Sequence, residues 1–448
     1  MNKEYQDHGK MLERAASLLR EEPPRMDDAV VEKFVSGYIE DRDRFLGLVE
    51  HSGSPLYAVD TEGIRRSLRR FREAFSILPG PVEVFYALKS NNSPLIARTV
   101  LEEGAGIDVS SAAELQTALG AGAEKILFSG PGKTDHELSR ALTENEHVTL
   151  LMNSFSELER LDVVTRKRFH KIGAGVRLTT SRDPLWRKFG IPLPMLEEFF
   201  RRAAPMPFIE IEGLQFHTSW NRDPGAQVAF IHDLADTLQE LPGSMLSRIR
   251  FIDIGGGYWP EQGEWLRPGG TEAGRLRSLL TGSLPDPRER YLLESAPIER
   301  FAEEISKAIR DRMPREVECS FYLEPGRWLC HDNMHLLMKV VDVKSTDFVI
   351  TDAGTNAIGW ERFEHDYFPV INLSSPSTSE RDCMIFGSLC TPHDVWGYSY
   401  HGGSIREGDV LLIPTQGAYT YSLKQEFIKP LPAAVDMNSY RRYRADRT

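Results

Sequence analysis

The stretch VFYALKSNN, residues 84–92, is an apolar run that ends in Lys89 and passes at once into polar residues. Such a run is typical of a buried strand, and Lys89 then lies at the carboxyl end of that strand. Seven further strand-like runs follow, and several of them also end in polar or glycine-rich groups. Barrel enzymes place their reacting groups at the carboxyl ends of the strands. The sequence therefore predicts a (β/α)₈ barrel with Lys89 at its mouth, where a lysine can form a Schiff base with a carbonyl cofactor.

The eight predicted strands are short β-branched or aromatic runs bounded by turn residues. Helical stretches such as 111–119 and 226–241 lie between them, and this alternation favours a parallel sheet in an α/β fold. The segment between the seventh and eighth strands is long, so we expect an insertion there, over the mouth of the barrel. The strands are predicted at 82–88, 105–109, 125–129, 148–152, 172–178, 211–216, 250–254 and 319–323.

The pattern differs on either side of this barrel. Residues 1–53 are charged, and their apolar residues recur at helical spacing. After Arg327, strand-like runs are separated by Gly, Pro, Ser and Asn, with little helix between them. We therefore expect a helical extension over 1–53 that packs partly on the β domain, a barrel over 54–327 and an all-β domain over 328–448. The strands of that last domain are predicted at 335–343, 347–351, 409–413 and 418–423.

The composition is that of a soluble protein of more than one domain, with 448 residues, 41% hydrophobic and 27% charged. A net charge of −12 argues against a general nucleic-acid binder. The four cysteines form no CxxC pair, so neither a disulfide framework nor a metal site is expected. The polar N-terminus and the lack of any apolar run near ~20 residues predict a cytoplasmic protein without a membrane partner.

The groups at the strand ends each have a structural and a chemical interpretation. His217 is either a satisfied polar residue or a group in a site. Gly255-Gly256-Gly257 is either a tight turn or a loop whose amides approach a phosphate. In EPGR, residues 324–327, the glutamate either forms a surface ion pair or holds a pyridinium nitrogen beside an anion-binding turn. Cys390 taken alone is read as a buried apolar thiol. The order of these groups on successive strands favours the chemical reading.

With these motifs in this order, the chain resembles the fold-type III pyridoxal-phosphate decarboxylases, the family of diaminopimelate, ornithine and arginine decarboxylases. The resemblance runs from about residue 54 to about residue 423 and implies an alanine racemase-like barrel followed by a β domain. The matched motifs are FYALKSN (85–91), GIDVSS (106–111) with Glu114, SGPGK (129–133), KFGI (188–191), FH (216–217), DIGGG (253–257), EPGR (324–327), DAG (352–354), GSLC (387–390) with Asp394, and GAY (417–419).

The resemblance implies a role for each matched residue. Lys89 holds pyridoxal 5'-phosphate as an internal aldimine, His217 stacks on the cofactor ring, and Glu324 pairs with the pyridine nitrogen. Cys390 crosses from the neighbouring subunit and protonates the carbanion left by decarboxylation, which implies a homodimer with shared active sites. Asp108 and Arg177 support the site at the barrel mouth. The further cofactor contacts implied are Gly256, Gly257, Gly326, Arg327 and Tyr419.

The chain departs from the family at positions that meet the substrate. Thr391 replaces the acid that follows the cysteine, and His365 aligns with a second acid that binds the same distal amine in ornithine decarboxylases. Without these carboxylates a buried ammonium lacks its charge complement. Trp360 aligns with an arginine of the diaminopimelate decarboxylases. We predict substrate contacts at His365, Thr391 and Asp394, and an L-amino acid whose distal amine is absent or acylated, as in the conjugates of siderophore or other specialised biosynthesis.

Another departure concerns the cofactor phosphate. Thr218-Ser219-Trp220 stands where the family has a small residue, a glycine and a phosphate-binding serine. Either phosphate binding is shared differently or Trp220 shapes an enlarged pocket, and Ser219 is a candidate ligand. Two other functions stay open: an amino-acid racemase or epimerase, and a non-catalytic regulatory homologue. The cysteine motif argues against the first, and the retained lysine, cysteine and phosphate groups argue against the second.

Overall fold

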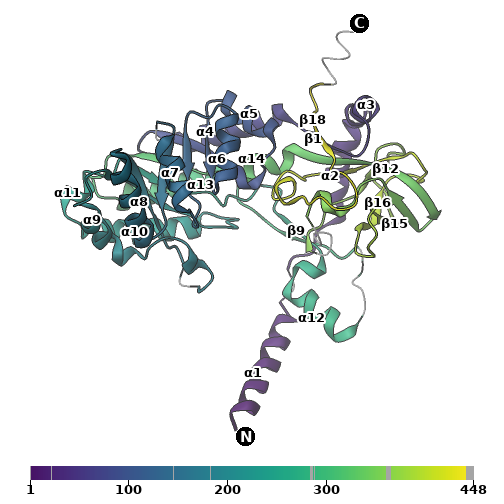
Figure 1. The fold of residues 1–448 in the computed structure, drawn as a ribbon. Coiled ribbons are helices and arrows are strands. Elements are labelled where there is room, and N and C mark those ends of the chain that lie inside the picture. The colour runs from purple at the N-terminus through teal and green to yellow at the C-terminus, as the bar shows by residue number, and fades with distance from the viewer. Residues whose placement is uncertain are drawn as a thin grey trace. The chain divides into compact units, whose positions relative to one another are not determined.

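The computed structural model describes residues 2–21, 23–144, 146–181, 183–282, 286, 288–359 and 365–439. Its first feature is a closed barrel of parallel strands in the order β11-β2-β3-β4-β5-β6-β7-β8, whose surrounding helices include α6, α7 and α8 in Figure 1. All of the predicted barrel strands are present, so the predicted fold is confirmed. Their bounds are β2 (Val82–Ala87), β3 (Gly106–Val109), β4 (Ile126–Phe128), β5 (Val148–Met152), β6 (Ile172–Leu178), β7 (Ile209–Phe216), β8 (Phe251–Asp253) and β11 (Ser320–Leu323).

Helices alternate with these strands, and several begin at a side-chain cap that the sequence supplies. Ser111 and Ser154 accept backbone N–H groups at the first turns of α6 and α8, and Thr134 forms a capping box with Glu137 at α7. The helices of this unit are α4 (Thr61–Phe75), α5 (Pro94–Glu102), α6 (Ala112–Gly120), α7 (Asp135–Thr143), α8 (Phe155–Arg168), α9 (Leu196–Ala203), α10 (Gly225–Gln239), α11 (Gly243–Leu246), α13 (Ile298–Arg312) and α14 (Arg327–Cys330).

Aromatic rings and glycines fill the inside of the barrel together. Phe251 stacks on Tyr322 with ring centroids 4.6 Å apart, and a Cβ added at Gly213 would lie 2.0 Å from the Phe251 ring. A side chain larger than hydrogen at Gly213 would therefore displace this ring. The barrel is a packed core and not a channel, which leaves the strand ends as the place for chemistry.

The second feature is a mostly antiparallel sheet in the order β13-β15-β16-β14-β17-β12-β1-β18. The all-β region predicted after the barrel is present, and α2 and α3 pack their apolar residues against it, with Val35 and Phe45 in one core with Leu337. The bounds are α1 (Asn2–Leu18), α2 (Asp28–Glu40), α3 (Arg42–Ser52), β1 (Leu56–Val59), β12 (Met334–Ser345), β13 (Phe348–Thr351), β14 (Ile371–Asn372), β15 (Glu380–Phe386), β16 (Val395–His401), β17 (Val410–Ile413) and β18 (Ala433–Asp436).

The two compact units do not follow the predicted boundaries. One unit comprises 61–261 and 295–331, and the other comprises 1–60, 262–294 and 332–448. The barrel unit begins after β1 because β1 pairs with β12 and β18, so that its backbone groups are satisfied in the other sheet. Within the described residues, no helix is both long and apolar enough to cross a membrane.

The insertion expected between the last two barrel strands is present and belongs to the unit of the β sheet. It contains β9 (Glu264–Leu266), α12 (Glu272–Thr281) and β10 (Tyr291–Leu293). β9 and β10 form a hairpin, with a bridge from Arg25 to Tyr291 on one side and from Leu266 to Asp366 on the other. Its location over the barrel mouth stays a prediction.

One predicted strand, at 418–423, is wrong. The segment is a turn that passes into a 3₁₀ helix at Tyr421–Leu423, and Tyr419 has a φ of 55°. The hydroxyl of Thr420 donates to the carbonyl of Gln416 and closes this turn locally. A residue in the left-handed region cannot continue a strand, so the apolar run was misleading.

Candidate functional site

The predicted cofactor residues of the barrel lie at the carboxyl ends of its strands. Because all barrel strands are parallel, these ends meet at one end of the barrel. They come from six of the eight strands or from the turns that follow them. They are Lys89 after β2, Asp108 in β3, Arg177 in β6, His217 after β7, Gly256 and Gly257 after β8, and Glu324, Gly326 and Arg327 after β11.

Lys89 is held by a buried carboxylate. Its Nζ donates to Oδ2 of Asp108 at 2.8 Å, and the Lys89 side chain is 34% exposed while that of Asp108 is fully buried. Oδ1 of Asp108 accepts from the hydroxyl of Ser129 at 2.5 Å. Burial, followed by the charge of Glu324, raises the pKa of Asp108, and Lys89 opposes this. The amine therefore has a fixed position, with access from outside.

Glu324 is a buried carboxylate that uses only one of its oxygens in a hydrogen bond within the described chain. Its Oε1 accepts from Nε2 of Gln215 at 3.1 Å, whereas Oε2 makes no hydrogen bond to any described residue. Burial alone would raise the pKa of Glu324, but the contact with His217 and the charge of Lys89 outweigh it and lower the pKa below its usual range. An ionised oxygen in this setting is suited to a cationic N–H group.

The ring of His217 is fixed by the glycine loop. The amide of Gly256 donates to Nδ1 of His217 at 3.1 Å, and Oε2 of Glu324 lies 3.5 Å from the same nitrogen. Burial lowers the pKa of His217, so the ring is neutral. The contact with Glu324 acts against this lowering of the His217 pKa.

Asp253 is a member of this cluster that the sequence did not single out beyond its motif. Its Oδ1 accepts from the amide of Gly255 at 2.8 Å, and its Oδ2 has no hydrogen-bond partner in the described chain. Burial, followed by the charge of Glu324, raises the pKa of Asp253 well above its usual value. Of these two acids, Glu324 therefore carries the charge and Asp253 the proton. The signal was a carboxylate at a strand end directly before three glycines.

The turns after β7, β8 and β11 approach one another with glycine at the contacts. A Cβ at Gly257 would lie 2.1 Å from the carbonyl oxygen of Thr218, and one at Gly256 would lie 2.2 Å from that of Glu324. Gly257 also has a φ of 86°, which L residues rarely adopt. The guanidinium of Arg327 lies 4.2 Å from the ring centroid of Trp259. Backbone amides and an arginine in such a turn fit a phosphate group.

Trp220 does not point its ring into a packed interior. The side chain is 64% exposed and its φ is 54°. The next residue holds this conformation, since the amide of Asn221 donates to the carbonyl of Gly257 at 2.9 Å and its Nδ2 donates to the hydroxyl of Thr218 at 2.8 Å. Ser219, predicted as a possible phosphate ligand, is partly buried in the same turn.

The other predicted residues belong to the unit of the β sheet. Asp394 uses both oxygens to hold its turn: Oδ1 accepts from the amide and hydroxyl of Thr355, in the 3₁₀ helix at Thr355–Ala357, at 2.7 and 2.9 Å, and Oδ2 accepts from the amide of Leu389 at 2.6 Å. It thereby fixes the turn on which Cys390 is exposed and Thr391 partly buried. These contacts make Asp394 a residue that shapes the turn.

The remaining predictions fall in separate places. Tyr419 is partly exposed in the turn described above, and His365 is exposed, with its carbonyl accepting from the amide of Arg267 at 2.9 Å. Trp360 lies outside the described residues. The structure thus brings the barrel residues together at one strand end and places Cys390, Thr391 and Asp394 in one turn of the other unit.

The residues at the barrel end fit pyridoxal phosphate. A held but accessible amine, a neutral ring fixed beside it, and an ionised oxygen without a partner match the aldehyde, the ring face and the pyridine nitrogen of this cofactor. No group of three or more His, Cys, Asp or Glu residues in the described ranges could hold a metal ion.

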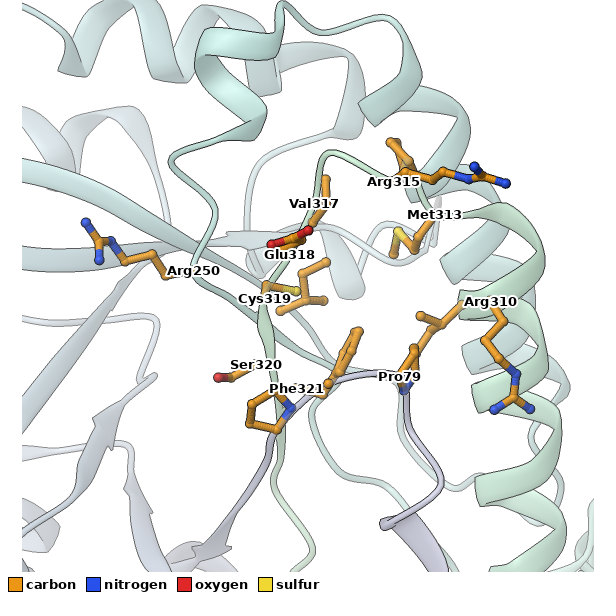
Figure 2. A pocket seen from close by; sticks show the side chains of 15 residues that line it. Pro79, Arg250, Arg310, Met313, Arg315, Val317, Glu318, Cys319, Ser320 and Phe321 are labelled. Atoms are coloured by element: carbon orange, nitrogen blue, oxygen red, sulfur yellow. The ribbon is translucent and has the colours of Figure 1, made fainter.

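A large cavity, of about 740 Å³, lies at the opposite end of the barrel (Figure 2). Its lining includes Pro81, Arg250 and Cys319, which directly precede β2, β8 and β11. Arg310 and Arg315 point away from its centre in Figure 2, and burial raises the pKa of Cys319 to about 12, which leaves an unreactive thiol. This end serves stability in barrel enzymes, so the cavity is not the reaction site.

Comparison with known proteins agrees with the chemistry of the barrel end. The model of the family described as pyridoxal-dependent decarboxylase, pyridoxal binding domain, matches residues 61–331. A diaminopimelate decarboxylase of Methanothermobacter thermautotrophicus is 29% identical over 87% of this chain and 87% of its own length. A 2-[(L-alanin-3-ylcarbamoyl)methyl]-2-hydroxybutanedioate decarboxylase of Staphylococcus aureus is 24% identical over 82% of this chain and 89% of its own.

Solved structures show the same fold. A lysine/ornithine decarboxylase from Vibrio vulnificus, complexed with putrescine, superposes with a TM-score of 0.70 at 23% identity, and covers 89% of this chain and 98% of its own. The family model spans more than half of the chain and contains every predicted cofactor residue of the barrel. The chain belongs to the pyridoxal-dependent decarboxylases of fold type III, carboxy-lyases that use pyridoxal 5'-phosphate.

Proposed function

We propose that this protein is an L-amino-acid α-decarboxylase whose substrate lacks a free distal amine, and that it works as a homodimer with shared sites. The observation that supports the chemistry best is the pairing of two buried carboxylates with two different tasks. Asp108 holds the amine of Lys89, and Glu324 keeps an ionised oxygen without a partner at the same barrel end.

The bound cofactor supplies an electron-withdrawing pyridinium ring, which weakens the bond between Cα and the substrate carboxylate. Glu324 keeps the ring nitrogen protonated, because an adjacent carboxylate favours the cationic form. Asp108 fixes Nζ of Lys89, the amine that would hold the cofactor through its aldehyde. His217 offers the flat face of a neutral ring, whose edge is held by the hydrogen bond from the amide of Gly256 to Nδ1.

Cys390 is proposed to return a proton to Cα after CO₂ has left. A thiol on an exposed turn suits this task, because it can enter a site formed mainly by another subunit. Asp394 contributes by fixing the turn through Thr355 and Leu389. We therefore propose that Asp394 positions Cys390 and Thr391 and does not itself bind the substrate, in contrast to its predicted contact.

The proposed substrate follows from neutral residues where related enzymes have acids. Thr391 and His365 replace two carboxylates, and burying a free ammonium without a partner costs more than the roughly 2–7 kcal/mol of an uncompensated neutral polar group. The S. aureus relative supports a conjugate, since its name describes an amino acid whose side chain is joined through a carbamoyl group. Siderophore or other specialised biosynthesis would supply such substrates.

A substrate panel tests this proposal. CO₂ release would be measured from free lysine, ornithine and diaminopimelate, and from diaminopropionate and ornithine acylated on the distal nitrogen. We expect kcat/KM at least tenfold higher for acylated forms, and equal rates for free and acylated forms would contradict the proposal. Following optical rotation in the same samples separates decarboxylation from racemisation. A visible cofactor band without any turnover would indicate a regulatory protein.

A further inference from the structure

A buried ion pair lies behind the barrel end, among residues that have no assigned role in the reaction. The side chains of Lys133 and Glu157 are 1% and 2% exposed, and Nζ donates to Oε1 at 2.8 Å. Nζ of Lys133 also donates to the carbonyls of Gly130 and Leu151 at 2.6 and 2.7 Å. All three ammonium protons thus have acceptors, as a buried lysine requires. The pair fastens the loop after β4 to β5 and α8.

Glu157 also holds the backbone of Asn153, the residue directly after β5. Oε2 of Glu157 accepts from the backbone amide of Asn153 at 3.2 Å. The Asn153 side chain then donates from Nδ2 to the carbonyl of Lys188 at 3.1 Å and accepts at Oδ1 from the amide of Gly190 at 2.8 Å. One amide group therefore clamps the segment 188–190 by both of its hydrogen-bonding functions.

The clamped segment lies tightly against β6. Gly190 has a φ of 74°, and a Cβ there would lie 2.7 Å from the carbonyl oxygen of Arg177. The amide of Ile191 donates to that same carbonyl at 2.9 Å. Directly before Gly190, the ring of Phe189 lies against the guanidinium of Arg177, with 4.5 Å between Cζ of Arg177 and the ring centroid. The segment thus supplies the surface on which the Arg177 charge rests.

Arg177 links this segment to the cofactor site, because its guanidinium contacts Phe189 and its charge acts on the acids of the site. It is 8% exposed, and its Nε makes no hydrogen bond within the described chain. Burial lowers the pKa of Arg177, and the charges of Glu324 and Asp108 act against this. Charges interact strongly in a low-dielectric interior, so a displacement of the guanidinium changes the field at Glu324.

We propose that Asn153 is a positioning residue of the cofactor site: by clamping 188–190 it holds Phe189 under Arg177 and thereby fixes the positive charge that faces Glu324. Lys133 and Glu157 hold Asn153 in place. The inference rests on the proposed function, in which Glu324 is the partner of the pyridine nitrogen.

The test measures cofactor binding and needs no turnover. Asn153→Leu keeps a similar volume but removes both hydrogen bonds, and Phe189→Leu removes the ring while leaving the clamp. Each protein, stripped of cofactor, is titrated with pyridoxal phosphate, and the pH midpoint of the visible band is recorded. We expect both variants to bind the cofactor about tenfold more weakly. We also expect the midpoint to rise by about half a unit, because moving Arg177 away favours the protonated, cationic form of the bound cofactor.

Two control variants separate positioning from mere structural damage. Ser306→Ala removes a partly buried hydrogen bond of 2.8 Å to the carbonyl of Ile77 elsewhere in the same unit, and it should lower the melting temperature without moving either readout. Phe189→Tyr keeps the ring and should behave like the unaltered chain. The proposal is overturned if Asn153→Leu changes only the melting temperature, or if Phe189→Tyr and Phe189→Leu behave alike. Should Asn153→Leu fail to fold, the two Phe189 variants decide the matter. If the unaltered chain shows the visible band but releases no CO₂, the proposed function is wrong. Cofactor binding and the pH midpoint still test the role of Asn153 in that case.

Discussion

The barrel end and the turn at 387–394 are built in opposite ways. At the barrel end, Lys89 and Glu324 stand against buried, hydrogen-bonded partners, and the charges are set by burial and by one another. On the turn, the buried carboxylate of Asp394 accepts hydrogen bonds that hold the backbone. The turn itself presents the exposed thiol of Cys390 and the hydroxyl of Thr391.

We infer from this difference that the barrel end sets the cofactor chemistry and that Thr391 on the turn sets the choice of substrate. Moving or removing one partner of a buried charge pair costs several kcal/mol of stability, on the order of 3–5, so substitutions at the barrel end are poorly tolerated. The turn presents neutral groups on a backbone fixed from behind, and a change in its exposed residues leaves the fold intact. We therefore expect substitutions at the barrel end, and loss of the Cys390 thiol, to abolish or slow the reaction, and substitutions at Thr391 on the turn to redirect it.

The largest effect is expected from Lys89→Ala. Loss of the amine removes the covalent attachment of the cofactor, so turnover and the visible band near ~420 nm should both vanish. The fold should persist, since Lys89 lies at a strand end and is 34% exposed. Circular dichroism checks the fold, and Lys125→Ala, which removes an exposed lysine, serves as the control. Activity like that of the unaltered chain would show that another lysine binds the cofactor.

A smaller loss is expected from Glu324→Gln. The neutral amide lowers the pKa of the pyridine nitrogen and weakens the electron sink, while the shape of the site is kept. Cofactor should remain bound, and kcat should fall by more than about tenfold, or ~1.4 kcal/mol. Glu83→Gln on the exposed side of β2 is the matched control. A smaller loss would mean that a different group, such as Asp253, holds the ring proton.

On the turn, Thr391→Asp should redirect selectivity. A carboxylate beside Cys390 offers a free distal amine the charge-assisted hydrogen bond that Thr391 cannot, worth roughly 1.5–3 kcal/mol. The ratio of kcat/KM for free ornithine over its acylated form should rise about tenfold, with little change in cofactor binding. Thr391→Asn has nearly the same shape without the charge. If both variants shift the ratio equally, the charge is not the determinant.

Much of the barrel end could be predicted from the sequence, because strand ends are marked locally. A strand such as 82–88 is recognised from its own residues, and the parallel order then brings Lys89, His217 and Glu324 to one end. What could not be predicted depends on neighbours from other strands. Gln215 and Ser129 matter only through their bonds to Glu324 and Asp108.

Outside the barrel, the errors have similar causes. Nothing local to 56–59 shows that this strand pairs with β12 and β18 in another unit. The apolar run at 418–423 suggested a strand, but the left-handed conformation of Tyr419 is imposed by the turn around it. For Asp394, a substrate contact stays a prediction from its motif position, and that position gave no sign that both oxygens bond to Thr355 and Leu389.

The last prediction joins the two regions, because it asks whether the turn of one chain completes the barrel site of another. Lys89→Ala chains and Cys390→Ala chains are each expected to be inactive. In a mixed dimer, one site combines the intact lysine of one chain with the intact cysteine of the other. Random pairing at equal amounts gives about half mixed dimers, each with one good site of two, so activity should recover to about a quarter of that of the unaltered protein. Two different affinity tags, recovered together, prove that subunits have exchanged. If mixed dimers form and stay inactive, Cys390 acts in the site of its own chain or outside any site, and the division of labour between barrel and turn lies within a single subunit.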